Sequence, residues 1–189
     1  FRSWAQRQGL VFAVVGMAVV LLPVALEAVA HPDLMLERPR DASVFKDLGP
    51  GGLVPTLAES VAKHLLMFNV TGDRNGRHNL PNAPMLDPIT AVGLVLGLLV
   101  VARRWRDPRS ALLLAWMPLA LLPAVLSVAF EAPQGLRAVG AVVPAVVLAA
   151  VAVTTVTDGL GLARSRVVMP LLLLVAGFSN ITTYFGVQA

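Results

Sequence analysis

The chain has 189 residues, of which 57% are hydrophobic and only 14% are charged, with a net charge of +4. Soluble domains keep about a quarter of their residues charged, so this composition excludes an ordinary soluble domain and favours a membrane protein. The absence of cysteine excludes a disulfide framework and a thiolate metal site. The chain starts at Phe1 without a signal peptide and ends abruptly, so we expect an internal piece of a longer protein.

Five apolar stretches predict an all-α integral membrane protein with about five transmembrane helices. Four of them contain about 20 residues, enough at about 1.5 Å per residue to cross roughly 30 Å of hydrocarbon. The second contains only about 14 residues, and it spans if Arg103 and Arg104 extend to the headgroups. The five stretches are 10–30, 89–102, 111–130, 138–157 and 167–186.

The basic residues predict an orientation for these helices. Eight of the 15 lysines and arginines lie in three short segments that share one side if the five stretches alternate. The positive-inside rule makes that side cytoplasmic, and the arginine-rich run 103–109 is then a topology determinant and not a nucleic-acid site. This interpretation divides the chain into a cytoplasmic lead with the first helix (1–30), an extracytoplasmic loop (31–87), a four-helix membrane region (88–187) and the start of an outer segment (188–189).

The loop 31–87 is too long for a simple connector and carries its own pattern. Thr56 and Glu59 fit a capping box. The apolar spacing after them predicts an amphipathic helix near 57–69 at the membrane surface or against the bundle, with His64 turned away from its apolar face. The following segment is rich in glycine, asparagine and proline, which predicts irregular structure. Its arginines and histidine could bind a phosphate, although a solvated loop is the alternative interpretation.

Two further features concern how the predicted helices pack and where one of them begins. Gly93 and Gly97 form a GxxxG pattern, and alanines crowd the stretch 138–157, which together predict close helix contacts. Asp87 precedes Pro88 at the start of an apolar stretch, where a carboxylate complements the N-terminus of a helix.

Several short runs of the loop and its neighbours share one recognisable pattern. They are Leu66-Met67-Phe68-Asn69, Gly72-Asp73, Arg77-His78-Asn79-Leu80-Pro81, Pro84-Met85-Leu86-Asp87, Arg40 with Ser43-Val44-Phe45, and Glu131-Ala132-Pro133. This pattern resembles the outer loops of bacterial lipid-carrier-dependent glycosyltransferases, in the group related to protein O-mannosyltransferases and aminoarabinose transferases with a GT-C fold. The resemblance extends along nearly the whole chain and is to the C-terminal half of such an enzyme.

The resemblance implies sugar transfer, without a cofactor, from a polyprenyl-phosphate donor to an acceptor at the outer face of the bacterial plasma membrane. The catalytic carboxylate of that group lies in an earlier outer loop that this chain lacks, so we expect no catalytic residue here and no activity of this piece alone. The candidates for contact with the donor phosphate are Arg77, His78, Asn79, Arg74, Arg40 and Arg137.

Each candidate also has a simpler explanation. Arg77 and His78 could pack in the loop, Arg74 and Arg40 could pair with neighbouring aspartates, and Arg137 could snorkel to the interface. The three histidines show no metal-binding spacing. A transporter module or a structural membrane anchor are the alternative functions, although the chain has no internal repeat and few ionisable groups near the centres of its apolar stretches.

Overall fold

The computed structural model of this protein describes residues 4–188, with the side chains of 8–37, 39–161 and 166–187. The described chain is all-helical and contains no β-strand, apart from one antiparallel bridge between Ser43 and Ser127. Its α-helices are α1 (Trp4–Ala30), α2 (Pro32–Asp41), α3 (Leu53–Leu66), α4 (Pro88–Arg103), α5 (Pro108–Val125), α6 (Val142–Leu160) and α7 (Leu162–Thr183). Short turns of 3-10 helix at Ala129–Glu131 and Val139–Ala141 join α5 to α6, and a π-helical turn, η3 (Tyr184–Gln188), follows α7.

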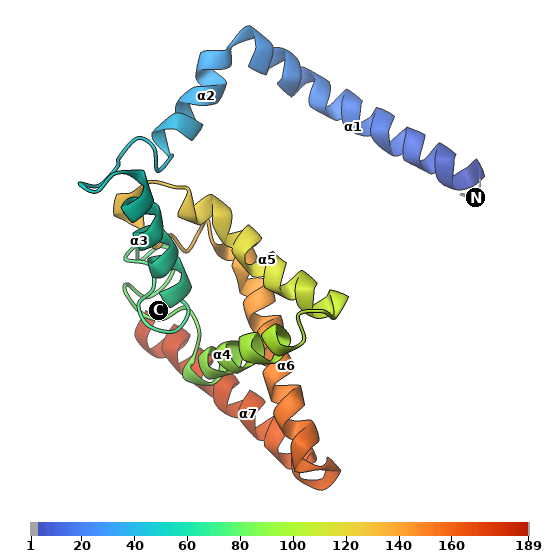
Figure 1. Ribbon diagram of the computed structural model, residues 1–189, viewed down its shortest axis with the longest axis vertical. Helices are drawn as coiled ribbons and strands as arrows, with labels where there is room; N and C mark the ends of the chain where they lie inside the picture. Colours follow the sequence, from blue (N-terminus) through green and yellow to red (C-terminus); the bar gives the residue numbers. More distant parts are fainter. Residues whose placement is uncertain (1–3, 189) are drawn as a thin grey trace.

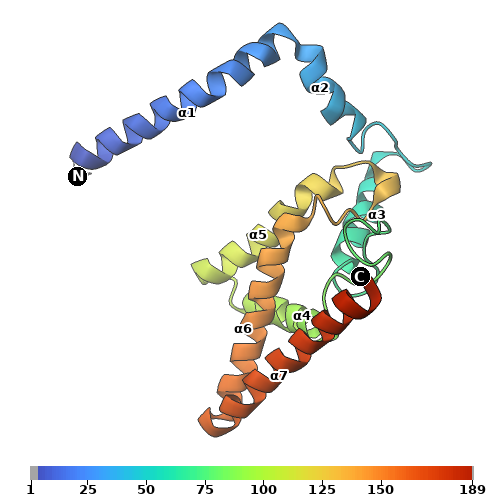
Figure 2. The ribbon, with the colours of Figure 1, turned by 180° about the vertical axis from the view of Figure 1, so that it is seen from behind.

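Four helical segments are long and apolar enough to cross a membrane, as the composition predicts. They are Gln8–Ala30, Pro108–Val125, Val139–Leu160 and Arg166–Val187. The remaining predicted span, α4, has 16 residues and is therefore roughly 24 Å long. Helices α6 and α7 form a hairpin whose turn lies at the bottom of both views, α4 crosses α6, and the α3–α4 loop lies near the C-terminus, away from that turn (Figures 1 and 2).

The closest helix contact in the bundle joins α4 to α6, and it depends on the two glycines of the GxxxG pattern. A Cβ atom built on Gly97 would lie 1.9 Å from the carbonyl oxygen of Leu148, and one on Gly93 would lie 3.1 Å from the Cβ of Ala149. Any larger side chain at Gly97 would push the two backbones apart. The predicted close packing is confirmed, and α4, α5 and α6 enclose a core that includes Leu94, Leu121 and Leu148.

Helix α1 stands apart from this bundle and meets α2 at the bend that joins the two helices (Figures 1 and 2). From residue 8 to residue 30 nearly all of its apolar side chains are exposed, including Phe12 and Val29, and its sequence has almost no polar side to turn outward. Such a surface is stable only when lipid or another protein chain covers it.

The helix predicted near 57–69 is present but begins earlier, and its predicted capping box is wrong. Gly52, with a φ of 80°, precedes the first residue of α3, so Thr56 lies one turn inside the helix. The Thr56 hydroxyl donates to the Gly52 carbonyl oxygen at 2.8 Å, and Glu59 pairs with Lys63 at 2.8 Å instead of capping. The 31–87 segment also contains a second helix, α2, which was not predicted because its sequence is rich in proline and charged residues.

One polar stripe of helix α3, formed by Thr56, Ser60 and His64, faces inward, whereas Glu59 is exposed as predicted. Ser60 and His64 are fully buried, whereas Val61 and Leu65 are exposed on the opposite side. The prediction that His64 faces away from the packed side was wrong. In a chain whose outer surface is apolar, the polar stripe of a helix is the side that finds hydrogen-bond partners within the protein.

Candidate functional site

Buried His64 connects α3 to the segment between α5 and α6. Its Nε2 accepts a hydrogen bond from the backbone N–H of Gln134 at 3.0 Å, so its proton is on Nδ1, which donates to the Ser60 carbonyl oxygen at 2.7 Å. Burial lowers the pKa of His64 below its ordinary value, because the charged imidazolium would lose its hydration. The neutral ring therefore serves as a fixed link between two segments that are 70 residues apart.

A second set of contacts fixes Arg137, which lies in the same segment. Its Nη1 donates to the carbonyl oxygen of Ala42 at 3.1 Å and to the hydroxyl of Ser127. The backbones on both sides of this contact are also paired, because Val44 N–H donates to the Leu126 carbonyl oxygen at 2.9 Å. The guanidinium is thus held by the chain just after α2 and by the end of α5, and its position does not depend on a ligand.

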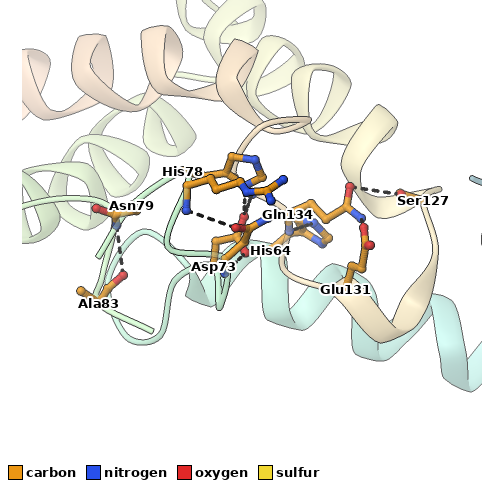
Figure 3. A network of polar contacts seen from close by, with 11 residues as sticks. His64, Asp73, His78, Asn79, Ala83, Ser127, Glu131 and Gln134 are labelled. Carbon is orange, nitrogen blue, oxygen red and sulfur yellow. Dashed lines mark hydrogen bonds and ion pairs between the residues drawn. The ribbon is translucent and has the colours of Figure 1, made fainter. Parts of the chain in front are cut away.

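Asp73 joins the 69–87 loop to the same segment. Its side chain is almost fully buried and accepts hydrogen bonds from the backbone N–H groups of Asn75 and Gly135 and from Nδ1 of His78, each at 2.8 Å (Figure 3). Burial on its own would raise the pKa of Asp73, but these three hydrogen bonds outweigh it and hold the pKa below its ordinary value. Asp73 is therefore a structural carboxylate that orients His78.

These contacts enclose a cavity of about 350 Å³ at the loop end of the bundle. Arg74, His78 and Arg137 line it together with the carboxylates of Asp73 and Glu131, while Phe130 and Leu136 form an apolar part of its wall. Because Asp73 occupies Nδ1 of His78, Nε2 is the ring atom that is left for a ligand. Both carboxylates already accept hydrogen bonds from the protein, Asp73 from His78 and Glu131 from Gln134. The two guanidinium groups and the apolar side chains therefore suit an anionic group that is attached to a hydrocarbon.

Not all the residues predicted to contact a phosphate come together. Arg74, His78 and Arg137 share this cavity, but Arg77, the leading candidate with His78, is exposed and is not among the residues that line it. Asn79 lines a different cavity, and Arg40 lies in α2 away from both.

The simpler explanation offered for Arg74 and Arg40 also fails. Asp73 pairs with His78, and Asp41 pairs with Lys46 at 2.6 Å, so neither aspartate is paired with an arginine in the described structure.

Three residues of the site were not predicted from the sequence. Gln134 and Glu131 are hydrogen-bonded to each other beside Arg137, and Gln134 also accepts from the Ser127 hydroxyl at 3.2 Å (Figure 3). They lie in a short connection without periodicity, and Glu131 was noticed only as part of the run Glu131-Ala132-Pro133, without a role in the site. His64 was noticed only as an isolated histidine, and its partner is the backbone N–H of a distant residue.

Within the described residues, no group of three or more histidine, aspartate and glutamate side chains is arranged to hold a metal ion. Comparison with protein-family models, with curated proteins and with solved structures finds no match to this chain. The site must therefore be interpreted from its own geometry and chemistry.

Proposed function

We propose that this chain forms the phosphate-binding part of a membrane glycosyltransferase that uses a polyprenyl-phosphate-linked sugar. The observation that carries this proposal is the cavity in which Arg74, His78 and Arg137 converge from two segments about 60 residues apart. The proposal assigns the catalytic carboxylate to a segment beyond residues 1–189, so the chain binds the donor and does not complete the reaction. Sugar transfer from such a donor requires cationic groups that stabilise the leaving phosphate.

The distribution of charge supports placing this cavity at the extracytoplasmic face. The cavity residues belong to the 31–87 loop and to the α5–α6 connection, at the end of the bundle opposite the arginine-rich 103–109 turn. The positive-inside rule assigns that turn to the cytoplasm. In this arrangement α1, α4, α5, α6 and α7 all cross the bilayer, and α4 does so with Arg103 reaching its headgroups.

The shape of the surroundings supports a lipid-borne ligand. The apolar side of α3 faces outward, and an apolar groove of about 570 Å³ lies between α3, α4 and α5. Leu65, Leu98 and Met117 are among its lining residues. An apolar groove of this size could hold part of the hydrocarbon tail of a lipid-borne phosphate.

A matched pair of arginines provides the test of phosphate binding. Arg74 and Arg77 are both exposed and lie three residues apart in one loop, but only Arg74 lines the cavity. Binding of a short-chain polyprenyl phosphate to the chain in nanodiscs can be followed by its ³¹P resonance. We expect Arg137→Ala and Arg74→Ala to weaken binding by about tenfold each, because a hydrogen bond to a charged group contributes roughly 1.5–3 kcal/mol, and Arg77→Ala to bind like the unchanged protein.

An equal loss of polyprenyl-phosphate affinity in Arg74→Ala and Arg77→Ala would show that binding depends only on the net charge of the loop. Unchanged binding in the Arg74→Ala, Arg137→Ala double variant would refute the proposed site.

The orientation has its own test, which uses the absence of cysteine from the chain. Asn75→Cys and Arg106→Cys each introduce a single thiol at an exposed position, one beside the cavity and one in the arginine-rich turn. In intact cells, a membrane-impermeant maleimide should modify the first thiol and spare the second. Modification of only the second would reverse the proposed orientation.

A further inference from the structure

A second cavity, of about 520 Å³, lies between the 79–88 segment, the start of α4 and the end of α7. Its polar lining differs in kind from that of the phosphate cavity because, apart from the carboxylate of Asp87, it consists of amides, hydroxyls and one aromatic ring. These groups belong to Asn69, Asn79, Ser179, Asn180, Thr183 and Tyr184. No arginine, lysine or histidine lines this cavity.

The three amides are oriented by bonds to the protein. Each donates from Nδ2 to a backbone carbonyl oxygen, at distances between 2.8 and 3.3 Å. Asn79 and Asn180 each use both N–H groups of Nδ2 within the protein, and Asn69 uses one, so the Oδ1 atoms are the main groups that remain for a ligand. The pairs are Asn69 with Ala91, Asn79 with Ala83 (Figure 3) and Asn180 with Ala176.

The one carboxylate beside this cavity is fully occupied. Asp87 caps α4, accepting from the backbone N–H groups of Ile89 and Thr90 at 3.0 and 3.1 Å, and also accepts from the Thr90 hydroxyl and from Asn180. The contact with Asn180 fixes the end of α7 against the start of α4. Asp87 therefore shapes the cavity and repels anions, while amide oxygens and hydroxyls are left to bind a ligand.

We propose that this second cavity binds a neutral sugar ring. Amide oxygens accept hydrogen bonds from ring hydroxyls, the Ser179 and Thr183 hydroxyls both donate and accept, and the Tyr184 ring offers an apolar surface to the carbon–hydrogen face of a sugar. The lack of cations and the presence of ionised Asp87 select against a phosphate. The inference goes beyond the proposed phosphate site, since none of the residues that line this cavity lines the other one.

The only tyrosine of the chain is Tyr184, which makes it a specific reporter. Incorporation of 3-fluorotyrosine gives one ¹⁹F resonance from the wall of this cavity. The protein should be held in an amine-oxide detergent, because alkyl-glycoside detergents would occupy the site. We expect methyl glycosides to shift the resonance in a saturable manner in the millimolar range, and glycerol and inorganic phosphate at equal concentrations to leave it in place.

Two neighbouring threonines provide matched variants. Thr183 lines the cavity, whereas the Thr182 hydroxyl is bonded to the backbone of its own helix at 2.9 Å. Thr183→Val should weaken glycoside binding about fivefold or more, the effect of one lost hydrogen bond, and Thr182→Val should bind like the unchanged protein. Ser179→Ala should weaken binding in the same direction.

Three results would overturn the proposal. These are the absence of a saturable shift with every methyl glycoside, an equal shift with glycerol or phosphate, and equal binding by the Thr183→Val and Thr182→Val proteins. Each of them leaves the phosphate-binding test unaffected, because that test uses a different ligand and different residues.

Discussion

Helices α3 and α4 are held in the molecule by opposite means. Helix α4 approaches α6 where Gly93 and Gly97 have no side chains, so its contact depends on backbone proximity. Helix α3 is held by buried polar groups, above all His64 and Ser60, whose hydroxyl donates to the Val125 carbonyl oxygen at 3.0 Å. When apolar side chains also cover the outward faces of the helices, hydrophobicity does not determine which face of a helix packs inward. That face is determined by small residues and by hydrogen bonds.

The largest effect on stability is expected at the α4–α6 contact. Gly97→Ala places a methyl group 1.9 Å from the Leu148 carbonyl oxygen, which forces the two helices apart and costs about 3 kcal/mol, the upper part of the range for overpacking. Gly93→Ala should cost less, because its nearest neighbour is a side-chain methyl group at 3.1 Å. The unfolding midpoint in detergent measures both. Gly16→Ala, in α1 with no neighbour within 4 Å, is the control that should not lower the midpoint, because alanine favours a helix over glycine.

Replacement of His64 is expected to have the next largest effect. His64→Leu removes the acceptor of the Gln134 N–H, and an unpaired buried donor costs about 1–3 kcal/mol. The loss should appear locally as faster hydrogen exchange of the Gln134 amide, together with a lower unfolding midpoint. Replacement of the neighbouring Lys63 by alanine breaks only an exposed ion pair and should leave both measurements as they are. If the Gln134 amide of the His64→Leu variant were protected from hydrogen exchange as in the unchanged protein, the hydrogen bond to His64 would not be what holds α3.

A smaller, pH-dependent effect follows from the lowered pKa of His64. The unfolded chain, whose imidazole has an ordinary pKa near 6.5, takes up the proton at higher pH than the folded chain does. The contribution of neutral His64 to stability is therefore complete above about pH 6.5 and declines as the pH falls below that value. Asp73, whose pKa is also lowered, loses its contribution only in more acidic solution, below about pH 4.

We therefore expect a lower unfolding midpoint at pH 5.5 than at pH 7.5, and a smaller difference between the two in a His64→Gln variant. A pH dependence that is identical in both proteins would show that other groups cause it.

The same contrast between α3 and α4 explains what the sequence could predict. The GxxxG contact and the Asp87 cap of α4 were predictable because each depends on a few residues that are close together in the sequence. The start of α3 was misplaced because Thr56 and Glu59 match a capping box that the preceding Gly52 makes unnecessary. The burial of His64 could not be predicted, since its partner, the Gln134 N–H, is 70 positions away.

The candidate site follows the same rule. The sequence drew attention to the loop 69–87 by its density of arginine, histidine and amides, and His78 and Arg74 do line the cavity. The resemblance named Arg77 and His78 first among the candidates, and snorkelling to the interface was the simpler explanation for Arg137. In the structure Arg137 is brought to the cavity by contacts with Ala42 and Ser127, which come from distant parts of the chain.

The most direct test of the account is to locate a bound donor lipid on the chain. A polyprenyl phosphate with a photoreactive group next to its phosphate would be bound to the protein in nanodiscs, irradiated, and its attachment mapped by mass spectrometry. We predict attachment in 73–78 and in 130–137, the two segments that line the phosphate cavity. Attachment confined to the arginine-rich turn 103–109 would contradict the account, because that result would mean that the chain attracts lipid phosphate only at its opposite end.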